Sequence, residues 1–159
     1  MLQGMQLKEQ VQLYKEDILE YDGIWCISIN ENYDKTVKTK NRIRMIPICS
    51  KLLDLGFLDY CNSIEKNNDR LFPNKNAKTF SSWYRKAINP LVTSRDNVVM
   101  YSMRHSYVNN LYQREDSNLT HISCLVGHYT NEKSNMTLNY TQDIHPKFLV
   151  KLANSIYRL

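Results

Sequence analysis

The hydrophobic positions of this chain change period along its length, from helical spacing to strand-like spacing and back. Apolar side chains recur every three or four positions over residues 5–19, which predicts an amphipathic helix. The dipeptide Asp22-Gly23 is a turn signal. Residues 24–29 (IWCISI) are rich in β-branched and aromatic side chains and predict a strand, and residues 37–48 predict one or two more.

Basic residues occupy alternate positions of the strand-like stretch at residues 37–48. They are Lys38, Lys40, Arg42 and Arg44. Because successive side chains of a strand point to opposite faces, this spacing predicts that all four cations share one face of the sheet. A solvated outer face and a surface that binds a polyanion both fit this pattern.

The remaining pattern is helical. Ser50 is a candidate cap for a helix that reaches residue 64 and is interrupted near Gly56. A further helix is expected over residues 80–88, ended by Pro90. Four more helices are expected, at residues 102–114, 118–126 (ended by Gly127), 132–140 and 146–157.

Together these elements predict an α+β fold, rich in helices, with a small antiparallel sheet near the N-terminal end. The length of 159 residues fits one domain over residues 1–159. The sequence contains no run of about 18 apolar residues, and its first eight residues lack the apolar core of a signal peptide. We therefore expect a cytoplasmic protein without a membrane span.

Composition adds a weak preference for a polyanionic partner. The formal net charge is +5 and the isoelectric point is near 9.0, although a basic balance indicates nucleic-acid binding only where the cations cluster. The four cysteines lie in apolar runs without a C-x-x-C pair, so we expect reduced core residues rather than a disulfide framework. They are Cys26, Cys49, Cys61 and Cys124.

A metal site is one alternative that the sequence raises. The spacing of His121, Cys124 and His128 places three possible ligands along one helical face. However, Gly127 is expected to end that helix before His128, and no fourth ligand is close in the sequence. We therefore expect no metal ion here.

Three short motifs in the C-terminal half carry a more specific signal. YSMRH stands at residues 101–105, LVGH at residues 125–128 and MTLNY at residues 136–140. In this order and at this spacing they resemble the conserved boxes of the catalytic domain of the tyrosine recombinases (phage integrase family), which includes site-specific recombinases and integrases of mobile elements.

The N-terminal half extends this resemblance, which covers about residues 3–145. KTKNRIRMIPI at residues 38–48 is similar to the strand–turn–strand that carries the family's catalytic lysine. GMQLKE at residues 4–9 resembles the box Gly-x-Arg-x-x-Glu that opens the catalytic helix. Since the sequence begins almost at this box, the family's separate helical core-binding domain is expected to be absent from it.

The resemblance implies cleavage and rejoining of duplex DNA without a metal or nucleotide cofactor. A tyrosine of the family attacks a phosphodiester, which forms a 3′-phosphotyrosyl link and frees a 5′-hydroxyl. On the matching positions, Tyr140 is the implied nucleophile and Arg104 a bidentate phosphate ligand. His128 is implied to hydrogen-bond the scissile phosphate. Lys38 is the preferred general acid, with Lys40 as the alternative.

The resemblance also implies a DNA-facing surface formed by Lys40, Arg42, Arg44 and His105, although His105 could equally be a hydrogen-bonded core histidine. The C-terminal segment of the family docks on a neighbouring protomer. Residues 146–159 here carry an apolar face, so we expect a homo-oligomer on DNA through this segment. The apolar residues at helical spacing are Phe148, Leu149, Leu152 and Ile156.

Two positions depart from the family pattern. Gln6 stands where the first arginine is expected, and it offers hydrogen bonds but no charge. Tyr101 replaces a histidine and, with an ordinary pKa near 10, cannot exchange a proton near neutral pH. Losing one preorganised charge-stabilising group costs about 10²–10³ in rate. We therefore expect either an impaired strand-transfer enzyme or a catalytically inactive DNA-binding or assembly module.

Overall fold

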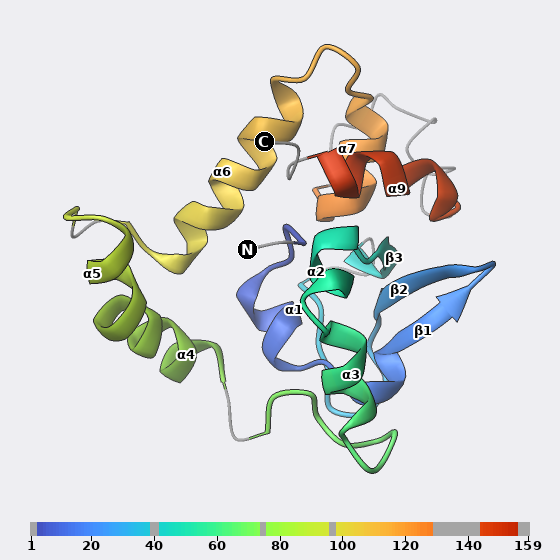
Figure 1. The fold of residues 1–159 in the computed structure, drawn as a ribbon, viewed down its shortest axis with the longest axis horizontal. Helices are drawn as coiled ribbons and strands as arrows, with labels where there is room; N and C mark the ends of the chain where they lie inside the picture. Colours follow the sequence, from blue (N-terminus) through green and yellow to red (C-terminus); the bar gives the residue numbers. More distant parts are fainter. Residues whose placement is uncertain (1–2, 39–41, 74–75, 96–97, 129–143, 156–159) are drawn as a thin grey trace.

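The computed structural model describes residues 3–38, 42–73, 76–95, 98–128 and 144–155 (Figure 1). Three antiparallel strands form a sheet in the order β1-β2-β3, from β1 (Ile18–Tyr21), β2 (Ile24–Ile29) and β3 (Arg44–Pro47). Asp22 and Gly23 join the first two strands with φ angles of +54° and +75°, the conformation that tight hairpin turns require. The predicted strand at residues 24–29 and the predicted turn are confirmed.

The predicted helix over residues 5–19 is correct only at its start. The helix α1 (Leu7–Val11) gives way to a short 3-10 turn, η1 (Lys15–Asp17), and then to β1. The backbone N–H of Tyr14 donates to the Asp17 carboxylate over 2.8 Å, and the next two N–H groups donate to carbonyls of residues 67 and 69. These bonds replace the helical ones, so the helix cannot continue.

The first helical segment after β3 is interrupted at the predicted position, and the second continues past its predicted end. Gly56, at φ +79°, separates α2 (Ser50–Asp54) from α3 (Phe57–Asn62), as predicted. The predicted end at Pro90 is wrong. The helix α4 (Ala77–Trp83) continues as a π-helical turn, η3 (Tyr84–Ile88), and then as α5 (Asn89–Val92). Pro90 lies in the first turn of α5, where no backbone N–H is needed.

Three helices build the C-terminal part that the structure describes, namely α6 (Met100–Tyr112), α7 (Leu119–Val126) and α9 (Lys147–Asn154). The Asn118 side chain caps α7 by accepting two backbone N–H bonds, and Gly127 ends it at φ +67°. Both features agree with the sequence pattern. The helix expected over residues 132–140 lies outside the described residues.

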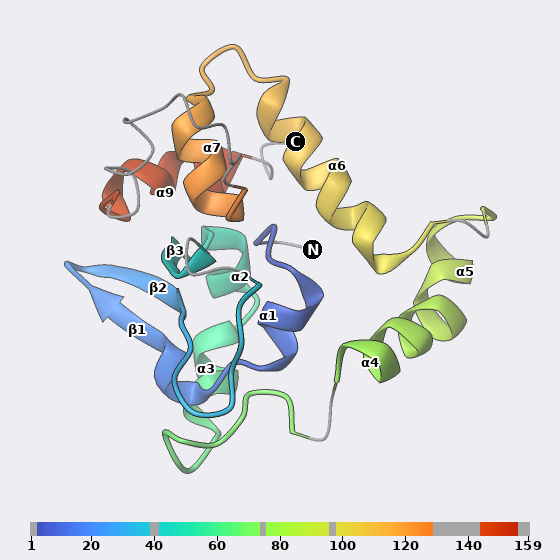
Figure 2. The same ribbon diagram turned by 180° about the vertical axis from the view of Figure 1, so that it is seen from behind.

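The core lies between the sheet and the helices α6, α7 and α9, which gather at one end of the molecule (Figures 1 and 2). The side chains of Ile27 and Ile46 from the sheet meet Ile122 and Leu125 of α7 there, all at most 2% exposed. All four cysteines are buried as well. None of the described helices has the length and apolar character needed to cross a membrane.

The apolar face of α9 packs within its own chain. Leu149 and Leu152 are 1% and 9% exposed, because α9 packs against α7 and β3. Phe148 points away and is 56% exposed, and Ile156 lies outside the described residues. The expectation that this face is free to dock on a neighbouring protomer is therefore wrong for its described part.

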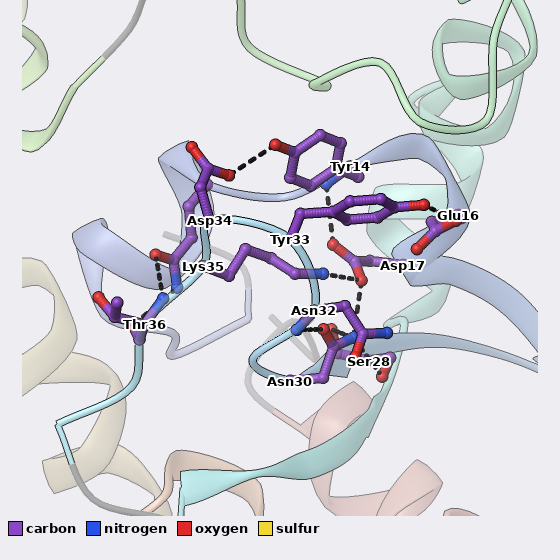
Figure 3. A network of polar contacts seen from close by, with 11 residues as sticks. Tyr14, Glu16, Asp17, Ser28, Asn30, Asn32, Tyr33, Asp34, Lys35 and Thr36 are labelled. Atoms are coloured by element: carbon purple, nitrogen blue, oxygen red, sulfur yellow. Dashed lines mark hydrogen bonds and ion pairs between the residues drawn. The ribbon is translucent and has the colours of Figure 1, made fainter.

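A buried ion pair fixes the first half of the connection between β2 and β3. The ammonium of Lys35 lies 2.5 Å from an oxygen of Asp17, and both side chains are at most 2% exposed (Figure 3). The same carboxylate accepts from the side-chain amide of Asn30 and the backbone N–H of Tyr14, each over 2.8 Å. The connection is thereby held against the segment that precedes β1.

This network predicts unequal costs for two neighbouring carboxylates. Asp17→Ala leaves the Lys35 ammonium buried without its anion, which should lower the free energy of unfolding by about 3–5 kcal/mol. Asp34 pairs with Arg70 at the surface, with its own side chain 66% exposed, so Asp34→Ala should cost much less than Asp17→Ala. Urea unfolding followed by circular dichroism measures both. Equal costs would contradict the assignment.

Candidate functional site

Five of the predicted site residues converge at the C-terminal end of α7. They come from the approach to β3, from α6 and from the residue that follows Gly127, and hydrogen bonds from Arg44 and Arg104 reach the last carbonyls of α7. The five are Arg42, Arg44, Arg104, His105 and His128, and each of the other four is close enough to His128 to affect its titration. The tertiary structure therefore gathers a cationic cluster from positions up to 86 residues apart in the sequence (128 minus 42).

Arg44 lies inside the protein rather than on a DNA-facing surface. Its side chain is 3% exposed, and its guanidinium binds both carboxylate oxygens of Glu9 over 3.0 Å each. It also donates to the carbonyls of Arg42 and Leu125, over 2.8 and 3.3 Å. The prediction that Arg44 contacts DNA is wrong, because β3 is covered on the side from which this side chain projects.

The predicted alternation of four cations on one strand face is likewise wrong. Among the described residues of that stretch, the strand begins only at Arg44. Lys38 is exposed in the connection before the strand, and Arg42 is half-buried in a turn. Lys40 lies outside the described residues, so the choice between Lys38 and Lys40 as general acid stays a prediction.

Arg104 is also buried, at 2% exposure, and it links two distant segments. Its guanidinium donates to the carbonyl of Gly4 and to that of Val126, the latter over 2.5 Å. Burial is the main reason that the pKa of Arg104 falls to about 10, with Glu9 opposing this shift and Arg44 adding to it. The side chain therefore remains a cation at neutral pH.

His128, in contrast, is exposed at the edge of the cluster. Partial burial of its ring lowers the pKa of His128 below the usual 6.5, and the positive charges of Arg104 and Arg42 lower it further. The ring is then mostly neutral at pH 7. An anion bound beside it would have the opposite effect and favour the protonated ring.

Two exposed residues of α6 border the cluster. The ring of Tyr101 packs edge-on against His105, with 4.4 Å between the centroids, and Tyr101 is 59% exposed. The alternative that His105 is a core histidine is therefore wrong, since its side chain is exposed. Both rings are placed where an approaching ligand can contact them.

Glu9 is the acidic member of the site, and the sequence offered it only as part of the GMQLKE box. Burial by itself raises the pKa of Glu9, but the charge and hydrogen bonds of Arg44 and the N–H of Gln6 more than offset this, so the pKa lies below its usual value. Gln6 is the residue before α1, and its backbone N–H donates to Glu9 over 2.8 Å. Gln6 thus lies beside the cluster, at the place where the resemblance expects an arginine.

The predicted nucleophile, Tyr140, lies outside the described residues. The alternative metal ligands do not form a group, because His121 stacks on Phe148 with centroids 6.5 Å apart while Cys124 faces the core. Within the described ranges, no three or more histidine, cysteine or acidic side chains are placed to hold a metal ion.

Comparisons with protein-family models, with curated proteins and with solved structures found no match for this chain. The resemblance to the tyrosine recombinases therefore rests on the motifs and on the convergence of the residues that carry them.

The lowered pKa of His128 predicts a pH dependence of stability. Because the folded protein binds this proton less readily than the unfolded chain, stability is full above pH 6.5 and declines as the pH falls from there through the folded-state value. His128→Gln should flatten the free energy of unfolding over this window, as measured by urea unfolding at several pH values. An unchanged profile would place the titrating group elsewhere.

Proposed function

We propose that this chain binds the phosphodiester backbone of duplex DNA at the cationic cluster, as a domain of the tyrosine-recombinase type. The observation that carries the proposal is the convergence of three arginines and one carboxylate in a single cluster. Arg42, Arg44 and Arg104 contribute three positive charges and Glu9 one negative charge, which leaves a net charge of +2. The positive charges repel one another, which raises the free energy of the site, and a bound anion relieves this repulsion.

The geometry indicates which groups meet the phosphate. Arg44 and Arg104 direct their donors to carboxylate and carbonyl oxygens, whereas a terminal nitrogen of Arg42 is buried without a hydrogen-bond partner among the described residues. A buried donor of this kind is costly unless a ligand satisfies it. Arg42, His128 and His105 therefore form the contact surface, and the two buried arginines supply a positive field behind it.

DNA binding is better supported than strand cleavage. Arg104 is 2% exposed and already donates to the carbonyls of Gly4 and Val126, so fewer of its N–H groups are available to the two phosphate oxygens that a cleaving enzyme must stabilise. Gln6 adds no charge. Strand cleavage is the second candidate, favoured by the position of Tyr140 twelve residues after His128. In that reaction the Tyr140 hydroxyl gives up its proton to a base or to solvent and its oxygen bonds to phosphorus. The bond from phosphorus to the 5′ oxygen breaks, and that oxygen takes a proton from Lys38 or Lys40.

Binding to a fluorescein-labelled duplex, measured by anisotropy at several salt concentrations, tests the first proposal. The logarithm of the binding constant should fall with the logarithm of salt by about 0.9 for each phosphate contacted. Arg42→Gln should reduce that slope by about 0.9 and weaken binding about tenfold near 0.1 M salt.

Lys66→Gln is the matched control, because it removes the same charge from an exposed loop after α3. It should leave the slope unchanged. If Arg42→Gln and Lys66→Gln behave alike, or if binding of the unmodified chain does not respond to salt, the cluster is not the DNA site.

A nicked duplex that traps the covalent product tests strand cleavage. The chain as it stands should form little adduct, and Gln6→Arg with Tyr101→His should raise adduct formation by about 10²-fold, because a second guanidinium then stabilises charge on the phosphate. Tyr140→Phe in the repaired background should abolish the adduct. If the repaired chain binds the duplex and still forms no adduct, only the binding function remains.

A further inference from the structure

Arg44 makes more contacts than an ion pair with Glu9 requires. Besides the two bonds to the carboxylate, its Nε donates to the carbonyl of Leu125, and one terminal nitrogen donates to the carbonyl of Arg42. Four hydrogen bonds from one guanidinium therefore join α1, the approach to β3 and the end of α7. The last carbonyls of a helix lack partners within the helix, and a cation stabilises them.

Gly127 shows how closely Arg44 approaches this helix end. A Cβ atom built on Gly127 would lie 2.7 Å from a terminal nitrogen of Arg44 and 2.8 Å from its Cζ. The flat guanidinium therefore occupies the space of any side chain at this position. The left-handed φ of Gly127 then turns the chain so that His128 follows directly.

Arg44 and Arg104 share the carbonyls of this helix end. Arg44 binds that of Leu125, and Arg104 binds that of Val126. The backbone N–H groups of Gly127 and His128 both return to the carbonyl of Ser123, the latter over 3.1 Å. The backbone up to His128 is thus fixed from both sides, and this histidine is an exposed member of the cluster.

We infer that Arg44 is a positioning residue, which holds the end of α7 and thereby sets the His128 ring beside Arg42 without itself contacting the phosphate. The identity of the ligand that the ring contacts rests on the proposed function, whereas the contacts of Arg44 do not depend on it. A lysine at position 44 would keep the charge opposite Glu9, yet it lacks the planar fork that reaches three segments. Arg44→Lys therefore separates positioning from charge.

Amide hydrogen exchange and DNA binding of the whole chain form the experiment. In Arg44→Lys, the amides of residues 127 and 128 should exchange about tenfold faster, while those of Ile27 and Ile46 in the sheet keep their protection. This selectivity distinguishes a released helix end from a general loss of stability. Binding to the labelled duplex should weaken about tenfold with an unchanged salt slope.

Arg42→Gln is the contrasting variant, since it should reduce the salt slope by about 0.9 and leave the two amides protected. If Arg44→Lys does not fold, Gly127→Ala displaces the same guanidinium from the other side and should show the same selective exchange. Unchanged protection at residues 127 and 128, or a slope that falls with Arg44→Lys, would overturn the inference. If the unmodified chain binds no DNA, the proposed function fails, while the exchange rates still decide the role of Arg44.

Discussion

The arrangement of this site depends on two buried guanidinium groups that satisfy the C-terminal carbonyls of α7. Burying such cations is costly unless they are hydrogen-bonded and at least partly neutralised. Arg44 meets both conditions through Glu9, whereas Arg104 has carbonyl partners and shares the field of the same carboxylate. These bonds join the helix end to the N-terminal segment and to β3.

The same bonds have an electrostatic consequence for the surface above them. Since the cluster contains three arginines and only one carboxylate, positive charge remains, and it affects the groups at the exposed edge. Together with partial burial, it lowers the pKa of His128 and keeps that ring neutral. Under the proposed function, it also makes the Arg42 nitrogen that has no hydrogen-bond partner among the described residues a favourable place for an anion. Under the proposed function, the arginines that hold the helix end and the residues that contact the anion thus belong to one set of charges.

Under the proposed function, the use of the same arginines for structure and for charge explains why the site suits binding better than catalysis. A phosphoryl-transfer site needs donors that are free to follow the charge that develops on phosphorus. Arg104 directs donors to main-chain oxygens of Gly4 and Val126, and Gln6 supplies an amide where a second guanidinium would help. Under the proposed function, a site of this composition would still attract the phosphate of DNA, but it has less charge to offer to the transition state.

The sequence alone determined the features that depend on neighbouring residues. The hairpin at Asp22-Gly23, the strand at residues 24–29 and the end of α7 at Gly127 follow from local conformational preferences. The motifs also named the five members of the cluster, because Arg42, Arg44, Arg104, His105 and His128 belong to recognisable boxes.

Tertiary structure alone decided which faces are covered. A period of two shows that side chains alternate, but it does not show which side of β3 is buried. The sequence therefore predicts a DNA-facing surface for Arg44, whereas the fold buries its side chain. The apolar spacing of residues 5–19 suits a helix. However, two backbone N–H groups of this stretch donate to the carbonyls of residues 67 and 69, and the backbone forms a turn and a strand there. The role of Glu9 follows from its ion pair with Arg44, which lies 35 residues away in the sequence. Such contacts between distant segments form only when the chain folds, and for that reason no local pattern contains them.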